Sequence, residues 1–371
     1  MKTARALSDL RDLGRLGLAP ETFVPAFLEA LHGLVASYRN LFDWTDAQGR
    51  LLRYFIEGPV DHRIARLYFE EFHNTREADA MPAFETLPAT PAGVRGAQAL
   101  AQPAFFRTAL YQEIWRPQGF HSRIEGVVRG RGGQLLGSLV LYRSADQPVF
   151  DSADEQRLAA ALPLLAEGLE APVSDAAQDP EQPHVRSPEP TQTLLLTPSG
   201  RLCHASPGAM RLLMLADGGL GPESLNRPLS HLGDGVLCAM LTQVQALAAL
   251  PPGRAPLPRL IHQNAWGRFV LEGHLLQAQS ADCEPMVLVH LSRWEPHHVA
   301  LSRALRSLPL TPGQRAVCRE LYLGASHNEV ADRLQVAPAT VVDHVRKVYR
   351  ALDLRSTLEL RATLDRHIAA V

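Results

Sequence analysis

The residues whose types and spacing could do chemistry lie in a predicted helix at 338–352. One face of this helix carries polar side chains that could contact nucleic acid: Thr340, Asp343, Arg346, Lys347 and Arg350. The opposite face carries apolar residues that recur at helical spacing: Val341, Val345, Val348 and Leu352. Exposed basic side chains can neutralise phosphates or bind guanine. An ordinary solvated face is the alternative, because residues 311–371 hold nine Arg and Lys against seven Asp and Glu.

Asp343 lies on the polar face, where a carboxylate would repel phosphate. One interpretation is an ion pair with Lys347, because side chains four residues apart are neighbours on a helix. The other is a hydrogen bond accepted from the amino group of a cytosine. The sequence leaves both open. We interpret the neighbouring His344 as a packed or flanking histidine.

Short capped helices must position this face. Three stretches fit the capping box Ser/Thr-x-x-Glu/Gln, in which each side chain binds the backbone N–H of the other residue: Thr311 with Gln314, Ser326 with Glu329, and Ser356 with Glu359. Pro312 suits the first position of a helix, and Gly324 suits a left-handed end. The predicted helices span about 312–323, 327–334, 338–352 and 357–370. A two-turn helix, a tight turn and a longer helix form a helix-turn-helix, whose second helix lies in the major groove.

Residues 309–371 resemble the C-terminal DNA-binding domain of the LuxR family. The matching features are LTP at 310–312, Gly324, Ser326, Glu329, Ala331, ATVVDHV at 339–345 and VYRALDLRSTLEL at 348–360. The resemblance implies that the third helix reads the major groove and that the fourth pairs with a second subunit. On the fourth helix, Leu360, Leu364 and Ile368 recur every four residues and are the predicted dimer contacts.

Several positions depart from the family pattern. Gly313-Gln314 replaces the usual Arg-Glu, although Gln can still complete the capping box. Val342 stands where a basic residue is usual, which puts one phosphate contact in doubt. Ala337 replaces a capping Ser or Thr, at a cost of about 1 kcal/mol. Gln335 stands where Gly often turns the chain. We expect the helix-turn-helix to form despite these changes.

Composition divides the chain into domains. Residues 171–190 are rich in Pro, Ser and acidic side chains, which predicts a linker. It separates an input domain at 1–170 from a second domain at 191–295. A connecting helix at 296–308 then leads to the DNA-binding domain at 309–371. The expected fold class is multidomain, with α+β sensor-like N-terminal and central domains followed by an all-α four-helix helix-turn-helix domain.

Both domains ahead of the connecting helix alternate helical and strand patterns. Helices are expected at 21–38, 60–73, 104–115 and 152–170, the last with a Ser152 cap, and hairpins are expected around AQGR at 47–50 and RGGQ at 131–134. The stretch from 111 to 163 resembles the GAF-like input domains that precede certain bacterial DNA-binding regions. Residues 193–215 read as strand, turn, strand and a helix capped near Ser206, an order similar to a small PAS-like domain.

Aromatic residues gather in the first domain. A GAF-like domain often encloses a small apolar ligand, so the resemblance implies an effector pocket there. The candidate pocket residues are Trp44, Tyr54, Phe69, Phe105, Tyr111 and Trp115. For each of them, an ordinary core position is the alternative. We predict that a small, largely apolar effector stabilises this domain.

Several enzyme classes are excluded by what the chain lacks. The only lysines are Lys2 and Lys347, so a phosphate-binding P-loop and a protein-kinase fold lack their essential Lys. A phospho-receiver domain is disfavoured for the same reason. No nucleophile elbow or zinc motif occurs, and the four Cys are too far apart for a zinc or redox pair. We expect no catalytic residue, metal or cofactor, and the sequence has no apolar run of about 20 residues and no signal peptide. A cytoplasmic protein without membrane contact is expected.

These observations together predict a DNA-binding transcriptional regulator. Its expected partners are double-stranded operator DNA, a small-molecule effector, RNA polymerase and a second copy of the chain. The alternative is an interaction module that contacts RNA polymerase or another regulator with little ligand sensing. The sequence identifies neither the effector nor the operator.

Overall fold

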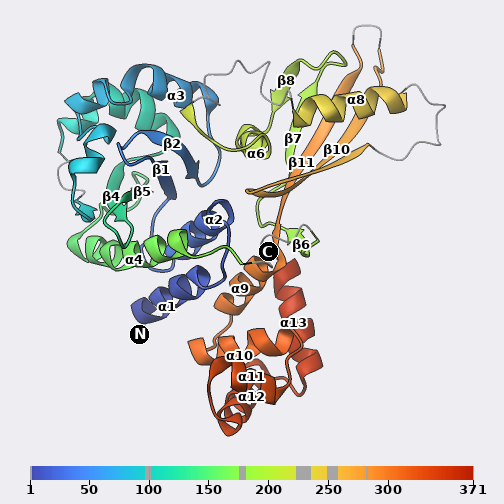
Figure 1. Cartoon of the computed structure of the whole chain (residues 1–371). Coiled ribbons are helices and arrows are strands. Elements are labelled where there is room, and N and C mark those ends of the chain that lie inside the picture. Colours follow the sequence, from blue (N-terminus) through green and yellow to red (C-terminus); the bar gives the residue numbers. More distant parts are fainter. Residues whose placement is uncertain are drawn as a thin grey trace.

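A computed structural model describes residues 2–96, 100, 102–174, 181–222, 235–248, 258–280 and 283–370. The expected fold class is confirmed. Two antiparallel sheets, each accompanied by helices, precede an all-helical C-terminal region (Figure 1). The two sheet domains lie side by side, and the C-terminal helices form a separate body below them in this view.

The N-terminal sheet has five strands in the order β2-β1-β5-β4-β3. They are β1 (Arg39–Thr45), β2 (Leu51–Ile56), β3 (Gly93–Arg95), β4 (Ser122–Arg129) and β5 (Leu135–Arg143). Both predicted hairpins form, β1 with β2 and β4 with β5. Gly137 has a φ of +152°, and a Cβ there would lie 1.9 Å from the carbonyl oxygen of Asp43. The close approach of β1 to β5 at this point therefore requires glycine.

Helices α2 (Pro20–Leu31) and α4 (Ser152–Glu170) pack on this sheet, and α1 (Lys2–Gly14) packs on both of them (Figure 1). Helix α1 had not been expected, and α2 ends seven residues before its predicted end at 38. The cap of α4 is also corrected. Asp151 accepts the N–H of Asp154 at 2.8 Å, and Ser152 is the first helical residue.

Two segments expected as amphipathic helices are irregular. The segment at 60–73 forms α3 (His62–Leu67) and then the π-helical turn η1 (Tyr68–Phe72). The segment at 104–115 forms a 3₁₀ turn, η5 (Phe105–Arg107), and the π-helical turn η6 (Leu110–Trp115). Apolar spacing indicated helical turns correctly, but it does not distinguish an i→i+4 from an i→i+5 hydrogen bond. Further short turns in the described residues are η2 (Arg76–Asp79), η3 (Phe84–Ala89) and η7 (Arg116–Gln118).

The central sheet has the order β8-β7-β11-β10-β9, with β6 paired to β11. Its strands are β6 (His184–Arg186), β7 (Gln192–Leu196), β8 (Leu202–Ala205), β9 (Arg259–Asn264), β10 (Gly267–Leu276) and β11 (Met286–Pro296). Helices α6 (Ala209–Ala216) and α8 (Val236–Ala248) pack on it. The N-cap of α6 is Gly208 rather than Ser206, whose hydroxyl instead accepts the N–H of Thr193 at 2.9 Å.

The predicted linker needs a local correction. Its residues 184–186 form β6, and Ser187 is buried. Residues 175–180 lie outside the described part of the chain. The domains on either side also share apolar contacts, because Trp266 stacks on Phe55 with ring centroids 5.9 Å apart and meets Trp44 edge-on. The domain boundaries stay predictions, but the two sheet domains pack against each other.

The C-terminal region consists of α9 (His297–Ser307), α10 (Pro312–Tyr322), α11 (His327–Leu334), α12 (Pro338–Leu352) and α13 (Thr357–Ala369). Helix α9 follows β11 without a break and contributes Ala300, Leu301, Ala304 and Leu305 to the core of this region. The capping boxes of α10 and α11 are complete. The third is half formed, because Glu359 binds the N–H of Arg355 rather than that of Ser356.

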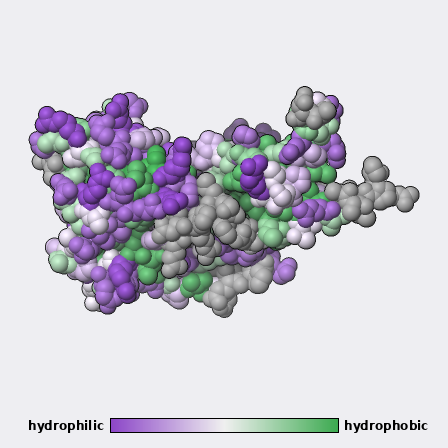
Figure 2. Space-filling model, turned by 90° about the horizontal axis from the view of Figure 1, so that it is seen from above, coloured by the Kyte–Doolittle hydropathy of each residue, from purple (hydrophilic) through white to green (hydrophobic). Residues whose placement is uncertain are grey.

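The described helices are not of a kind that could span a bilayer, since none is both long and apolar enough. Figure 2, a view from above, shows hydrophilic residues over much of the described surface and hydrophobic residues in smaller patches. The large hydrophobic side chains therefore lie mainly in the cores, which the burial of the individual residues supports.

Candidate nucleic-acid interface and effector cavity

The turn between α11 and α12 sets the orientation of α12. Gln335 closes α11 in the left-handed conformation, with φ at +53°, and the N–H of Val336 donates to the carbonyl of Ala331 at 3.0 Å. Pro338 then starts α12, and Ala337 supplies no side-chain cap, as its residue type predicts. Gln thus adopts the conformation that Gly usually provides, at some backbone strain. The departures at 335 and 337 leave the helix-turn-helix intact.

Helix α12 is divided into a buried and an exposed face. Val341, Val345 and Val348 are buried against α10 and α11, as predicted, and Leu352 packs against them half-buried. Thr340, Arg346, Lys347 and Arg350 are exposed, and Asp343 is half-buried. The structure therefore brings all five predicted side chains onto one accessible face. Val342, at the usual basic position, is exposed and apolar.

Asp343 forms an ion pair with Lys347. The Oδ2 atom of Asp343 lies 2.7 Å from Nζ of Lys347, and both side chains are about half exposed. The hydrogen bond from Lys347 lowers the pKa of Asp343. The ion-pair interpretation is thus realised in the free protein. His344 is half-buried beside Gly313, and a Cβ at 313 would lie 3.3 Å from its Cε1, so the ring is packed as predicted.

The predicted dimer contacts on α13 are wrong. Leu360 and Leu364 are completely buried and Ile368 is 8% exposed, all within the core of their own C-terminal region. Side chains buried in this way cannot meet a second subunit. The three apolar residues spaced every four positions form the stripe that packs α13 against α9 and α10. Leu358, at the start of α13, is instead 77% exposed.

Side-chain contacts tie the N-terminal domain to the C-terminal region. On α1, Arg5 donates to the carbonyl of Leu308 at 2.6 Å, and Asp9 pairs with Arg315 of α10. On α2, Glu29 pairs with Arg303 of α9. These contacts place the N-terminal domain against the helices that support α12, while the polar face of α12 stays exposed.

A cavity of about 110 Å³ lies inside the N-terminal domain. Aromatic rings from both π-helical turns, from the sheet and from the connection before β4 line it: Tyr54, Tyr68, Phe69, Trp115, Phe120 and Tyr142. Of the six predicted pocket residues, Tyr54, Phe69 and Trp115 are among them. Trp44 instead contacts Trp266 of the central domain, and Phe105 and Tyr111 pack with Phe106 outside the cavity. Three of the six predicted pocket residues are therefore buried in the core and do not line the cavity.

Charged side chains that the sequence reading missed also line the cavity: Asp43, His73, Glu77, Arg123 and Glu125. These charges stand out along the chain. Asp43 lies between the apolar residues Phe42 and Trp44 of β1, and Arg123 and Glu125 lie in β4, which is buried along nearly its whole length. Charged residues are almost never fully buried unless they are paired. Three buried charges on β1 and β4, the two strands that flank β5, therefore indicate an interior that is partly polar.

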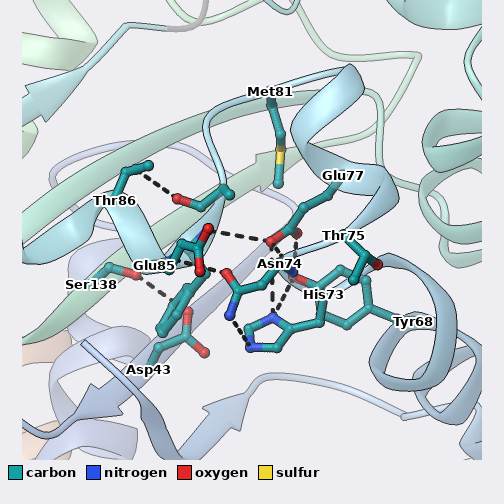
Figure 3. Close-up of polar contacts among 12 residues, drawn as sticks. Asp43, Tyr68, His73, Asn74, Thr75, Glu77, Met81, Glu85, Thr86 and Ser138 are labelled. Carbon is teal, nitrogen blue, oxygen red and sulfur yellow. Dashed lines mark hydrogen bonds and ion pairs between the residues drawn. The ribbon is translucent and has the colours of Figure 1, made fainter. Parts of the chain in front are cut away.

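Glu77 organises the loop beside the cavity. Its carboxylate accepts the hydroxyl of Tyr68 at 2.7 Å and the N–H groups of Asn74 and Phe84 at 2.8 and 3.3 Å. Figure 3 shows Glu77 with Tyr68, Asn74 and His73, and Nδ1 of His73 lies 3.3 Å from the Tyr68 hydroxyl. Burial lowers the pKa of His73. The contacts are satisfied when this imidazole is neutral and carries its proton on Nδ1.

Asp43 has fewer partners than Glu77. Ser138 donates a hydrogen bond to its Oδ2 at 3.3 Å, and no ion pair joins it to a basic side chain within the described ranges. Burial raises the pKa of Asp43 to about 8, and the negative charge of Glu125 adds to the rise while Arg123 opposes it. Arg123 itself lies 2.9 Å from Glu125. Asp43 is thus the carboxyl group in this cavity that a ligand can still engage.

The exposed polar face, the short first helix and the capped turn define a helix-turn-helix DNA-binding domain. Comparison with known families agrees, because residues 308–362 match the model of the bacterial regulatory proteins of the luxR family. The C-terminal domain therefore belongs to the LuxR family, and the chain carries the DNA-binding domain of a bacterial transcription regulator. No curated protein matches the chain.

Three of the solved structures that match the chain are distantly similar to it. The chain is similar to the phycoerythrobilin-bound GAF domain from a cyanobacterial phytochrome, with a TM-score of 0.31, 15% identity, and coverage of 45% of this chain and 96% of that one. The chain is also similar to the E. coli DhaR(N)–DhaL complex, with a TM-score of 0.25, 14% identity, and coverage of 78% of this chain and 87% of that one. Similarity to the phage VqmA–DPO complex has a TM-score of 0.20, 16% identity, and coverage of 50% of this chain and 87% of that one. Likeness at this level carries no argument about function.

Proposed function

We propose that this chain is a transcription regulator whose N-terminal domain binds a small molecule and thereby controls DNA binding by α12. The observation that supports it best is the division of α12. One face is locked into the core by three valines, and the opposite face presents Arg346, Lys347 and Arg350 to solvent. A second observation is the cavity in the same chain, inside a domain that contacts α9 and α10.

We further infer that the chain acts as a homodimer on a roughly palindromic operator. Two subunits related by a two-fold axis would place their α12 helices in successive major grooves. The surface that fits this role is the start of α13, because Leu358 is a large apolar side chain that is 77% exposed. RNA polymerase is the proposed further partner of the DNA-bound form.

Selection of bound fragments from genomic DNA of the source organism tests DNA binding, followed by affinity measurements on the enriched site at several salt concentrations. The double change Arg346→Ala with Arg350→Ala should weaken binding strongly. Arg107→Ala with Arg131→Ala, a double change that removes the same two positive charges at exposed positions of the N-terminal domain, is the matched control. Equal binding by the double variant and the parent would show that α12 is not the reading helix.

An interaction module that contacts RNA polymerase or another regulator is the second candidate. The observation in its favour is the weak positive charge of residues 311–371, combined with the neutralisation of Lys347 by Asp343. It predicts weak DNA binding that no ligand changes. The two functions therefore separate in a single DNA-binding assay carried out with and without a bound small molecule.

A further inference from the structure

The cavity of the N-terminal domain combines aromatic rings with more carboxyl groups than basic groups. A cavity needs roughly 10–15 Å³ on this measure to hold one water molecule, and this one has about 110 Å³. It therefore has room for a small organic molecule. Three carboxylates line it, from Asp43, Glu77 and Glu125, against one guanidinium, from Arg123.

The charges within the wall are not balanced. Arg123 lies 2.9 Å from Glu125, and Arg95 approaches the same carboxylate at 3.5 Å. Glu77 is satisfied by the hydroxyl and N–H groups of its own loop. Asp43 has Ser138 as its hydrogen-bond donor and Glu125 and Glu77 as negative neighbours. A bound anion would meet the negative charges of Glu77 and Glu125, whereas a bound cation would favour the ionised form of Asp43 and pair with it.

The aromatic rings of the cavity also favour a positively charged ligand. Tyr54, Tyr68, Phe69, Trp115 and Tyr142 surround the cavity, and the faces of such rings attract cations. Apolar rings also bury the body of a small ligand. A cationic head near Asp43 and an apolar body against the rings would satisfy both parts of the wall.

We propose that this cavity is a binding site for a small organic ammonium ion, with Asp43 as its counter-ion and the rings as its walls. The proposal rests on the proposed function, in which this cavity is the effector site, and it assigns the chemical class of the effector. It narrows the expectation of a small, largely apolar effector to one that also carries a positive charge, because a purely apolar occupant would leave the Asp43 carboxyl desolvated without a new partner.

Three probes with the same ring and different charge test the proposal on the full chain: benzylamine, benzyl alcohol and benzoate. Calorimetric titration should show one benzylamine bound per chain, with the other two at least tenfold weaker. Equal or tighter binding of benzyl alcohol or benzoate would overturn the proposal, and so would the absence of benzylamine binding to the folded chain.

Variants locate the site. Asp43→Asn keeps the size of the side chain and an oxygen that can accept from Ser138, so the fold should persist. It should weaken benzylamine binding at least tenfold. Asp79→Asn removes an exposed carboxylate from the neighbouring loop and should leave binding unchanged. Unchanged binding by Asp43→Asn would place the amine elsewhere and refute the assignment.

A second measurement needs no variant. Because the Asp43 carboxyl is largely protonated in the empty cavity near neutral pH, binding of an ammonium ion should expel its proton. Benzylamine affinity should therefore rise by up to about tenfold per pH unit between pH 6 and pH 8. The other titratable or charged groups around Asp43 are Glu125, Glu77 and Arg123 and the hydroxyls of Tyr54, Tyr68 and Tyr142, and His73 lines the same cavity. Titration in buffers of different ionisation enthalpy should show close to one proton released, and no release would contradict the counter-ion role.

DNA binding in the presence of each probe separates this proposal from the proposed function. If benzoate binds in the cavity and changes DNA affinity, effector sensing stands and the ammonium assignment fails. If benzylamine binds at Asp43 but leaves DNA affinity unchanged, the ammonium site stands and the sensing role fails.

Discussion

The guanidinium of Arg303 on α9 lies 2.7 Å from the carboxylate of Glu29 on α2, and its Nη2 lies 2.8 Å from Glu295 on β11. One side chain therefore joins the input domain, the central sheet and the helix that leads into the DNA-binding domain. Arg306, one turn further along α9, approaches Glu29 at 3.5 Å. A change in the input domain that moves α2 would act on α9 through this cluster.

Glu29→Gln should loosen this connection. Arg303 would keep Glu295 but lose a charged partner, and hydrogen bonds to charged groups contribute about 1.5–3 kcal/mol each. We expect a lower urea midpoint and a smaller effect of bound benzylamine on DNA affinity. Glu167→Gln, an exposed change on α4, is the control. An undiminished ligand effect in Glu29→Gln would show that coupling runs through other contacts, such as Asp9 with Arg315.

The three basic residues of α12 should divide into two roles. Lys347→Ala should weaken binding to all DNA sequences alike. It should also reduce the slope of log affinity against log salt concentration by about one, as loss of a phosphate contact does. Arg346→Ala or Arg350→Ala should cost about 1–3 kcal/mol and relax preference at one base pair, as loss of a guanine contact does. Binding to the enriched operator and its single-base variants measures both effects. Uniform weakening in all three variants would leave base reading to other residues.

Asp343→Asn should strengthen non-specific DNA binding. The ion pair at 2.7 Å neutralises Lys347 in the free protein, and its removal frees the ammonium for phosphate. An exposed pair of this kind contributes about 0.3–0.5 kcal/mol to helix stability, so the fold should be almost unaffected. Affinity for mixed-sequence DNA at several salt concentrations is the readout. If Asp343 accepts a bond from cytosine, the same variant should instead lose preference at one base pair, and the two outcomes are distinguishable.

Two leucines of α13 should affect different properties of the protein. Leu364 is completely buried, so Leu364→Ala should lower the free energy of unfolding by about 2–5 kcal/mol. Leu358 is 77% exposed, so Leu358→Glu should change stability by no more than about 0.5 kcal/mol and should weaken self-association and cooperative DNA binding. Urea unfolding and sedimentation measure the two properties. Unchanged association in Leu358→Glu would move the dimer surface to the other domains.

Asp43 should make stability pH-dependent. Its pKa is raised from 3.8 to about 8 by burial, so the folded chain holds more protons than the unfolded chain between these values. The free energy of unfolding should therefore fall as pH rises through this window, by up to about 1.4 kcal/mol per pH unit. Asp43→Asn lacks this group, so its advantage over the parent should grow from pH 5 to pH 8. A constant difference would show that the carboxyl is ionised throughout.

The sequence by itself determined the helix-turn-helix. Capping at Thr311 and Ser326 and the valine stripe of α12 act within a few residues, so their outcome can be derived from spacing and hydrogen-bond chemistry. The exposed positions of Arg346 and Arg350 followed from the same period, because a helix with one buried stripe must present its opposite face to solvent. The two predicted hairpins are local in the same way.

Tertiary structure decided what lay beyond these local rules. The leucine stripe of α13 could have faced a second subunit or its own domain, and only the packing of α9 and α10 showed that Leu364 is core. Trp44 and Trp115 are both buried aromatics, yet one meets the central domain and the other lines the cavity. Asp43 and Arg123 come together because β1 and β4 both flank β5. Such outcomes depend on which distant segments meet, and residue spacing along the chain carries no record of that.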